Sequence, residues 1–374
     1  MRILVGDILQ SKAQTLINTV NCVGVMGKGI ALEFKKRFPD MYDDYVKRCE
    51  RSEVKPGAPY IYKTLFPPQI INFPTKEHWK SISRLSDIER GLKHLIGHYQ
   101  EWGVTSLAMP PLGCGNGQLE WRVVGPLMYR FVKDMAIPVE LYAPYGTHPK
   151  ELTMEFLEHG AKAHTGQTVR NRQAALNPAW VALVEIVARI EQQPYHWPIG
   201  RTLFQKIAYV ATNEGLPTGL RYQRGSFGPF SDDLKSVETA LVNNGLLQEE
   251  RRGRMFVVKV GPNFSRIRQK YTSYFEQRAE TLEKAADLFM RVNTDQAEVI
   301  TTVLFTAREL AQERREPPSE TEVLESVMQW KQKRLPPLDQ RTVASTIRNL
   351  ATLKWLAVTA DPKLPVPEEE AIPV

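Results

Sequence analysis

The sequence predicts an α/β domain with a mixed sheet between helices, followed by a mainly α-helical region that contains a winged-helix-like part. Up to about residue 145, short apolar runs alternate with segments of helix length, which is typical of a sheet layered with helices. The runs 106–111 and 139–144 are continuous and apolar, as in strands buried on both faces. From residue 179 onward, helical periodicity replaces this alternation.

The elements of the first half follow from these patterns. Strands are predicted at 2–7, 15–20, 59–64, 69–75, 106–111 and 139–144, and helices at about 29–38, 40–50, 82–100 and 121–135. In sheets of this class a ligand binds outside the carboxyl ends of the strands. We therefore expect a site in the loops that follow the first, second, fourth and fifth strands.

The second half is predicted to be helical. Helices are expected at 179–192, 200–215, 231–247, 264–290 and 294–316 and as a pair within 319–356, with an apolar ribbon at 251–260. Three helices followed by a ribbon is the winged-helix order, here about residues 195–262. The predicted domains are 1–155, a linker at 156–178, a helical region at 179–360 and a disordered tail at 361–374, which is rich in proline and glutamate.

Composition restricts the possible classes of protein. The chain has 374 residues with 42% hydrophobic content, as in folded globular proteins, and no apolar run long enough to span a membrane. Three widely separated cysteines argue against a disulfide framework and favour a reducing cytoplasm. The net charge of +7 permits a nucleic-acid partner without requiring one.

The stretch "NTVNCVGVMGKGIALEFKKRF", residues 18–38, is the first candidate ligand loop. Gly24, Gly27 and Gly29 remove side chains where a strand passes into a helix, which leaves backbone N–H groups free to bind phosphate, with Lys28 at the rim. A simple tight turn is the alternative, because neither the Walker pattern nor the dinucleotide fingerprint is present.

A second glycine-rich loop, "PPLGCGNGQLEW" at 110–121, also follows a buried strand and precedes a helix. Two such loops at adjacent strand ends could hold two linked phosphates. Asp7 ends the first predicted strand at the same edge. Its carboxylate could accept a hydrogen bond from an adenine amine or could cap a helix, and the sequence favours neither.

These loops together resemble the macrodomain family of ADP-ribose binders, over roughly residues 1–155. "VGDI" resembles the adenine segment, "NTVNCVGVMGKGIA" the loop around the distal ribose and "PPLGCGNGQLEW" the diphosphate loop. The resemblance implies ADP-ribose binding with no cofactor and no metal. The implied ligand-binding residues are Asp7, Ile8, Thr19, Asn21, Gly27, Lys28, Gly29, Ile30, Thr75, Leu112, Gly113, Cys114, Gly115, Asn116, Gly117 and Tyr145.

The forms "MGKGIA" and "PPLGCG" resemble the macrodomain branch that contains terminal ADP-ribose glycohydrolases, in which a lysine lies beside the anomeric carbon of the distal ribose. In "INFPTKEHWKSIS" the spacing assigns this catalytic role to Lys80, and Lys76 is the competing candidate. A deprotonated lysine amine can attack that carbon and hold the opened ribose as a Schiff base. The branch also uses a loop aspartate, but Gly117 and Asn116 stand at this place, so no acid is present there.

A macrodomain joined to a long helical region resembles the DarG antitoxin family. This resemblance implies an enzyme that removes ADP-ribose from thymidine bases of single-stranded DNA. It also implies an ADP-ribosyltransferase toxin bound through the C-terminal region. The rival hypothesis is a non-catalytic ADP-ribose sensor with a DNA-binding tail, in which the basic run 251–254 meets phosphate. Acidic pairs such as Asp232 with Asp233 favour a protein partner for this region.

Three further candidates are weaker. His94 and His98 lie one helical turn apart but lack the glutamate and the third ligand of a zinc site. Cys114 has no evident basic partner, so we interpret it as a small loop residue and not as a nucleophile. Trp79 and Trp121 could stack on the ligand or belong to the core.

Overall fold

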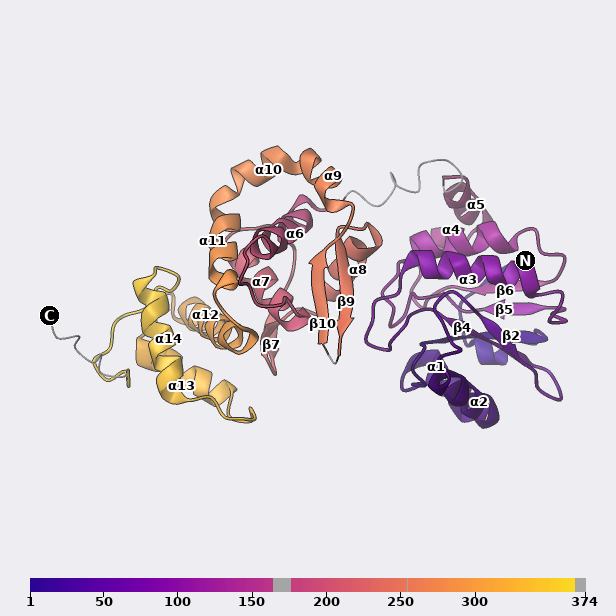
Figure 1. The fold of residues 1–374 in the computed structure, drawn as a ribbon, viewed down its shortest axis with the longest axis horizontal. Helices are drawn as coiled ribbons and strands as arrows, with labels where there is room; N and C mark the ends of the chain where they lie inside the picture. The colour runs from indigo at the N-terminus through magenta and orange to yellow at the C-terminus, as the bar shows by residue number, and fades with distance from the viewer. Residues whose placement is uncertain (164–175, 254, 367–374) are drawn as a thin grey trace. The chain divides into compact units, whose positions relative to one another are not determined.

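The structure, a computed structural model, describes residues 1–163, 176–253 and 255–366 (Figure 1). The chain forms two compact units. The first contains the N-terminal α/β region together with 238–244, and the second contains 176–237 and the residues from 245 onward. Among the described helices, none has the length and apolar character needed to cross a membrane.

A six-stranded sheet lies at the centre of the first unit, in the order β1-β6-β5-β2-β4-β3 (Figure 1). Its strands are β1 (Arg2–Leu4), β2 (Thr15–Val20), β3 (Tyr60–Tyr62), β4 (Gln69–Pro74), β5 (Leu107–Met109) and β6 (Val139–Tyr142). All neighbouring strands are parallel except β3, which runs antiparallel to β4. The predicted mixed sheet is confirmed, and each predicted strand contains the observed one.

Helices cover both faces of this sheet, as Figure 1 shows. They are α1 (Gly29–Arg37), α2 (Pro39–Glu50), α3 (Leu85–His98), α4 (Trp121–Val132) and α5 (Met154–Ala163). Successive strand residues point to opposite faces, so β2 contributes to two cores. Leu16 and Val20 pack in the core with Phe34 of α1, whereas Ile17 packs in the core with Leu92 of α3.

Helix α5 corrects the predicted linker. Residues 156–163 belong to this helix, which packs on α4 with Leu157 fully buried. Close contact is possible because Gly160 has no side chain: a Cβ there would lie 2.6 Å from Cγ of Pro126. At the other end, Asn177 caps the first helix of the second unit. Residues 164–175 lie outside the described part of the chain.

The second half of the chain is mainly helical. Its helices are α6 (Pro178–Glu191), α7 (Arg201–Asn213), α8 (Leu234–Asn243), α9 (Phe264–Arg268), α10 (Thr272–Gln277), α11 (Ala279–Met290), α12 (Thr294–Arg314), α13 (Glu320–Trp330) and α14 (Gln340–Thr352). The described residues also form two hairpins, β7 (Gln223–Gly225) with β8 (Gly228–Phe230), and β9 (Leu247–Arg252) with β10 (Met255–Val260). Because β7 and β8 interrupt the predicted order between α7 and α8, the winged-helix part stays a prediction.

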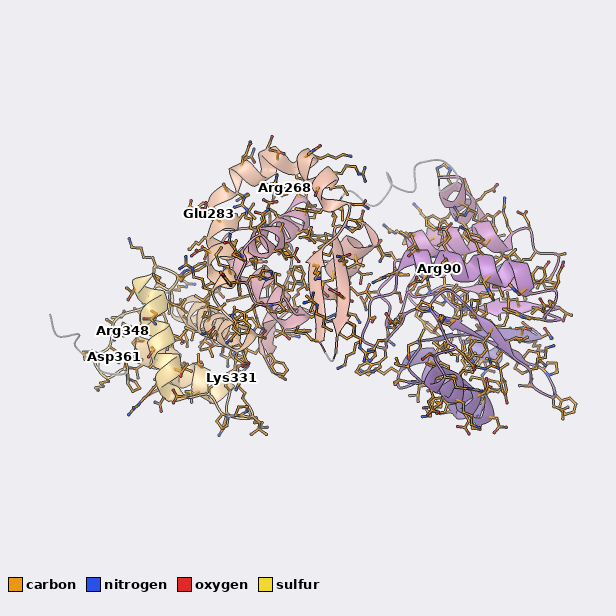
Figure 2. The ribbon with its side chains drawn as sticks, in the orientation of Figure 1. Arg90, Arg268, Glu283, Lys331, Arg348 and Asp361 are labelled. Atoms are coloured by element: carbon orange, nitrogen blue, oxygen red, sulfur yellow. The ribbon has the colours of Figure 1, made fainter. Side chains whose placement is uncertain are left out.

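The prediction of one continuous helix at 264–290 is wrong. The segment is divided into α9, a 3₁₀ turn, α10 and α11, and it curves around α6 and α7 (Figure 1). This curvature lets Phe264, Phe275 and Leu282 each reach the core, which one straight helix could not do. Arg268 also reaches the buried carboxylate of Glu185 on α6, at 2.6 Å (Figure 2).

The predicted tail also begins too early. The backbone N–H of Asp361 donates to the buried carboxylate of Glu320 at 2.9 Å, and Arg348 donates to the same carboxylate at 2.6 Å (Figure 2). Thr321 donates to Asp361 Oδ2 at 2.6 Å, and Leu364 is buried. Residues 361–366 therefore dock on α13, because a buried carboxylate needs donors. Residues 367–374 lie outside the described part.

Candidate active site

The loops after β2, β4 and β5 meet at the carboxyl edge of the sheet. These three strands are adjacent, and parallel strands end on the same side. The backbone N–H of Cys22, in the first loop, donates to the carbonyl of Glu77 in the loop after β4 at 2.9 Å. The Lys76 ammonium donates to the carbonyl of Asn116 in the loop after β5 at 3.0 Å. The three loops therefore form one connected surface.

The first glycine loop is shaped by Asn21, whose side chain is 6% exposed. Its Oδ1 accepts from the N–H of Val23 at 2.9 Å and from the hydroxyl of Tyr45 at 3.0 Å, while Nδ2 donates to the carbonyl of Val25. Both ends of the amide are thus used by partners in the loop and on α2. Asn21 acts here as a loop-shaping residue, and its contact with a ribose stays a prediction.

The loop ends at the start of α1. Gly27, Lys28 and Gly29 are exposed, and Gly29 adopts a φ of +60°, a left-handed conformation that glycine tolerates best. The first N–H groups of a helix have no partner within the helix, and they carry partial positive charge. With Lys28 at the helix cap, this end of α1 suits an anionic group.

The second glycine loop closes on itself through its backbone. The N–H of Leu119 donates to the carbonyl of Gly113 at 3.0 Å, and the N–H of Gln118 donates to that of Gly115 at 3.0 Å. Gly113 has a φ of +74°. Gly115 and Asn116 are exposed at the crest of the loop, whereas Gly113 and Gly117 are buried beneath it.

The two glycine loops touch where α1 begins. A Cβ built on Gly29 would lie 3.4 Å from the side-chain nitrogen of Asn116. Backbone N–H groups of both loops therefore border one region, which is the arrangement that two linked phosphates need. Sequence analysis predicted that both loops lie at the carboxyl ends of adjacent strands, and this contact supplies the geometry.

The two candidate lysines lie in different surroundings. Lys76 is only 9% exposed and reaches the second glycine loop. Lys80 is exposed, and its ammonium lies 4.8 Å from the ring centre of Trp79. The backbone N–H of Lys80 donates to Nδ1 of His78 at 3.1 Å, which shapes the turn that carries it. Of the two amines, that of Lys80 is the more accessible to a substrate.

The missing acid at Gly117 has a steric explanation. A Cβ at this position would lie 2.2 Å from Oγ of Ser83 and 2.5 Å from the carbonyl oxygen of Gly113. No residue with a side chain fits there unless the loop moves. Sequence reasoning did not consider Ser83, and no motif singles it out. Its role appears only when the loops after β4 and β5 are seen packed together.

Several predicted ligand residues are buried and could contact a ligand only through their backbone. Ile8, Thr75 and Leu112 are 3%, 4% and 0% exposed, and Thr75 extends the pairing of β2 with β4 by donating to the carbonyl of Val20. Thr19 and Ile30 are half-buried. Their predicted contacts with a ligand stay predictions.

Asp7 and Tyr145 lie in the loops that follow β1 and β6, which are also adjacent parallel strands. Asp7 is exposed and caps the 3₁₀ helix Ile8–Gln10 by accepting from the N–H of Leu9 at 3.0 Å. The capping interpretation is therefore confirmed, and an adenine contact through the second carboxylate oxygen stays a prediction. Tyr145 is 78% exposed.

The remaining candidates have structural roles. Trp121 is a core residue that donates to the carbonyl of Glu151 at 3.2 Å. Burial raises the pKa of Cys114 to about 12, so its thiol is protonated at neutral pH. The rings of His94 and His98 stack, with centres 4.0 Å apart. Across the ranges that the structure describes, no group of three His, Cys, Asp or Glu residues could hold a metal.

Comparison with known proteins identifies the family of this chain. A family model described as Macro domain matches residues 17–128. A Thermus aquaticus protein named DNA ADP-ribosyl glycohydrolase is 32% identical over 313 residues, which is 82% of each chain. A Thermosipho africanus protein named DNA ADP-ribosyl transferase–DNA ADP-ribosyl glycohydrolase fusion protein is 42% identical over 161 residues, 37% of this chain and 40% of that one.

Among solved structures, the macrodomain of Thermus aquaticus DarG is 46% identical, with a TM-score of 0.37. The match covers 38% of this chain and 97% of that one. The Thermus aquaticus glycohydrolase is similar over most of both chains, which extends the relationship beyond the macrodomain. The chain belongs to the DarG family of DNA ADP-ribosyl glycohydrolases.

Proposed function

We propose that the first unit removes ADP-ribose from thymidine bases of single-stranded DNA. The observation that carries this proposal is the junction of the two glycine loops at Gly29 and Asn116, beside the segment that bears Lys80. The relatives' names support the same reaction. In this arrangement, the N–H groups of both loops bind the pyrophosphate, and the adenine lies toward Asp7, Ile8 and Tyr145.

The proposed nucleophile is the amine of Lys80. Its nitrogen attacks C1 of the distal ribose, a C–N bond forms, and the bond from C1 to the thymine nitrogen breaks with its electron pair on the base. The ribose ring then opens to a Schiff base on Lys80, and water hydrolyses this link to release ADP-ribose. The base takes up one proton, so the enzyme is regenerated without a cofactor.

The absence of an acid at Gly117 is compatible with this substrate. A ring nitrogen of a nucleobase carries negative charge better than an alkoxide does, so its departure needs less help from a general acid. Ser83 excludes a carboxylate from that position. Cleavage of the glycosidic bond would therefore depend on the stability of the leaving nucleobase and on the attack of the Lys80 amine, without a general acid at Gly117.

The test of this function uses the wild type, Lys80→Ala and an oligonucleotide that carries ADP-ribose on thymine. We expect the wild type to release free ADP-ribose and the variant to bind the oligonucleotide without releasing it. If both proteins bind and neither releases ADP-ribose, the chain is an ADP-ribose sensor and the hydrolase proposal is wrong.

We also propose that the second unit binds an ADP-ribosyltransferase toxin and neutralises it directly. The Thermosipho africanus fusion protein supports such a pairing, because its name joins a transferase and a glycohydrolase in one chain. Exposed acids such as Asp232 and Asp233 could contact a basic DNA-binding surface on the toxin.

Direct neutralisation can be separated from catalysis by using Lys80→Ala. We expect this variant of the full chain to lower the initial rate at which the toxin modifies DNA, even though it cannot remove the modification. Charge reversal, Asp232→Lys with Asp233→Lys, should weaken that inhibition. An initial rate that Lys80→Ala leaves unchanged would show that the chain acts on the product alone.

A further inference from the structure

Lys76 stands where the three loops of the site meet. Its carbonyl accepts from the thiol of Cys22 in the first glycine loop at 3.4 Å, and its ammonium donates to the carbonyl of Asn116 in the second at 3.0 Å. The next residue, Glu77, accepts from the N–H of Cys22 at 2.9 Å. The chain then continues directly to Lys80. One short segment thus links both glycine loops to the nucleophile.

The contact with Cys22 persists at neutral pH. Burial, together with the nearby Cys49 and Glu77, raises the pKa of the Cys22 thiol to about 12. The thiol therefore remains protonated and able to donate to the Lys76 carbonyl. The first loop is held from the same segment by this bond and by its backbone N–H.

The bond from Lys76 to Asn116 fixes the orientation of one peptide unit. In a trans peptide the carbonyl and the next N–H point in opposite directions. By holding the Asn116 carbonyl, the Lys76 ammonium keeps this oxygen from turning toward a bound phosphate, whose oxygens would repel it. It also sets the direction of the N–H of Gly117. A charged donor makes a stronger bond than a neutral one, so the constraint is firm.

Burial distinguishes this role from that of a nucleophile. Lys76 is 9% exposed and its nitrogen already donates to a carbonyl, whereas Lys80 is exposed on the same loop. A nucleophile must present a free electron pair to the sugar carbon. A positioning residue must instead keep its hydrogen-bond partner, and the Lys76 nitrogen donates to the Asn116 carbonyl at 3.0 Å.

We propose that Lys76 is a positioning residue, which acts through the Asn116 carbonyl to hold the diphosphate loop in its anion-binding form and to fix the segment that carries Lys80. This inference rests on the proposed function in its catalytic part, because it concerns turnover by Lys80. Its binding part concerns free ADP-ribose alone. The two parts can therefore fail separately.

The test compares Lys76→Met, Lys76→Arg and the wild type as full chains. Lys93→Met, on the exposed surface of α3, is the matched control. We expect Lys76→Met to weaken ADP-ribose binding by about tenfold to a hundredfold, as for loss of a charged hydrogen bond. We expect Lys76→Arg to recover most of this loss and the control to bind as the wild type does. Lys80→Ala should keep ADP-ribose affinity within about twofold while losing turnover.

Trapping with borohydride, which reduces a Schiff base to a stable amine, identifies the lysine that reacts. We expect the ADP-ribose adduct on Lys80 in the wild type and in Lys76→Arg, and a slower rate of adduct formation in Lys76→Met. An adduct on Lys76 would overturn the proposal, as would Lys76→Met binding and turning over like the wild type. If Lys76→Met does not fold, equal affinity and equal rates for Lys76→Gln and the wild type would overturn it.

If the wild type shows no turnover, the hydrolase proposal fails. The affinities of the Lys76 variants for ADP-ribose then still decide whether Lys76 holds the loop. An unchanged affinity in Lys76→Met would reject the positioning role in that case.

Discussion

The ring of Phe73 on β4 packs into the space that the missing side chain of Gly91 leaves on α3. A Cβ on Gly91 would lie 2.3 Å from Cζ of Phe73, so the helix can approach the sheet this closely only with glycine at that position. Phe73 is fully buried, and its strand continues within three residues into Lys76. The seating of α3 on β4 therefore also sets the start of the loop that carries the proposed nucleophile.

Gly91→Ala is expected to destabilise the first unit by roughly 1–3 kcal/mol, because the new methyl group overpacks the core against Phe73. Gly97→Ala on the same helix is the matched control, since a Cβ there meets nothing within 4 Å. Alanine at that exposed site should be neutral or stabilising by up to about 1 kcal/mol. Denaturant unfolding measures both changes, and equal stability of the two variants would contradict this packing.

Gly117→Asp should fail to supply the missing acid. Its Cβ would overlap Oγ of Ser83 and the carbonyl oxygen of Gly113, so the loop must move and ADP-ribose affinity should fall by about tenfold or more. Gly97→Ala on α3 is the control, because a Cβ there meets nothing within 4 Å and this residue lies outside both glycine loops. Calorimetric titration with ADP-ribose measures both. A Gly117→Asp variant that binds normally would show that the loop yields easily.

Cys114→Ala should retain the wild-type rate of ADP-ribose release within about threefold. Burial raises the pKa of this thiol to about 12, so almost no thiolate exists at neutral pH to act as a nucleophile. Single-turnover kinetics at pH 7 and pH 9 test this expectation. A loss of a hundredfold or more in Cys114→Ala, with ADP-ribose binding retained, would give the cysteine a catalytic role.

Because Lys206 is buried, we expect the free energy of unfolding of the second unit to increase as pH rises. This lysine is 2% exposed, its nitrogen donates to the carbonyl of Pro229 at 2.8 Å, and it lies near Lys331 and Glu298. Burial and the positive charge of Lys331 lower its pKa from 10.5 to about 7, although Glu298 opposes this shift.

Between about pH 7 and pH 10.5 the unfolded chain therefore binds more protons at Lys206 than the folded chain does. By linkage, the free energy of unfolding increases with pH across that window and levels off on either side. Thermal unfolding of the full chain at several pH values should show this slope, and Lys206→Met should flatten it. The same slope in both proteins would assign the effect to other groups.

The α/β half of the chain was predictable because its strands and helices are marked by local patterns. Every observed strand of the sheet lies inside a predicted one, and the predicted segments of α1 to α4 are helical. The predictions failed where contacts between residues far apart in the sequence determine the local structure. Residues 156–163 were predicted to be a linker, yet they belong to an amphipathic helix that packs on α4, where Gly160 and Pro126 fit together.

Predictions for the second half of the chain succeeded and failed for the same reasons. Helical periodicity predicted most helices. It could not show that 264–290 curves around α6, because this bend depends on contacts with distant residues, such as the ion pair between Arg268 and Glu185. Composition likewise favoured a disordered tail from 361. The buried carboxylate of Glu320 holds Asp361 instead, through a bond that no local pattern shows.

By itself the sequence determined the class of the fold, the two glycine loops, their place at adjacent strand ends, and two lysines as candidates for the nucleophile. The period of apolar residues and the spacing of motifs are local properties of the sequence. Because parallel strands end on the same side of a sheet, these local properties also predict where the loops lie. Only the tertiary structure decided that Lys76 is buried against Asn116 while Lys80 is exposed, and that Ser83 excludes an acid at Gly117. These relationships depend on side-chain packing between segments far apart in the chain, and such packing leaves no periodic pattern in the sequence.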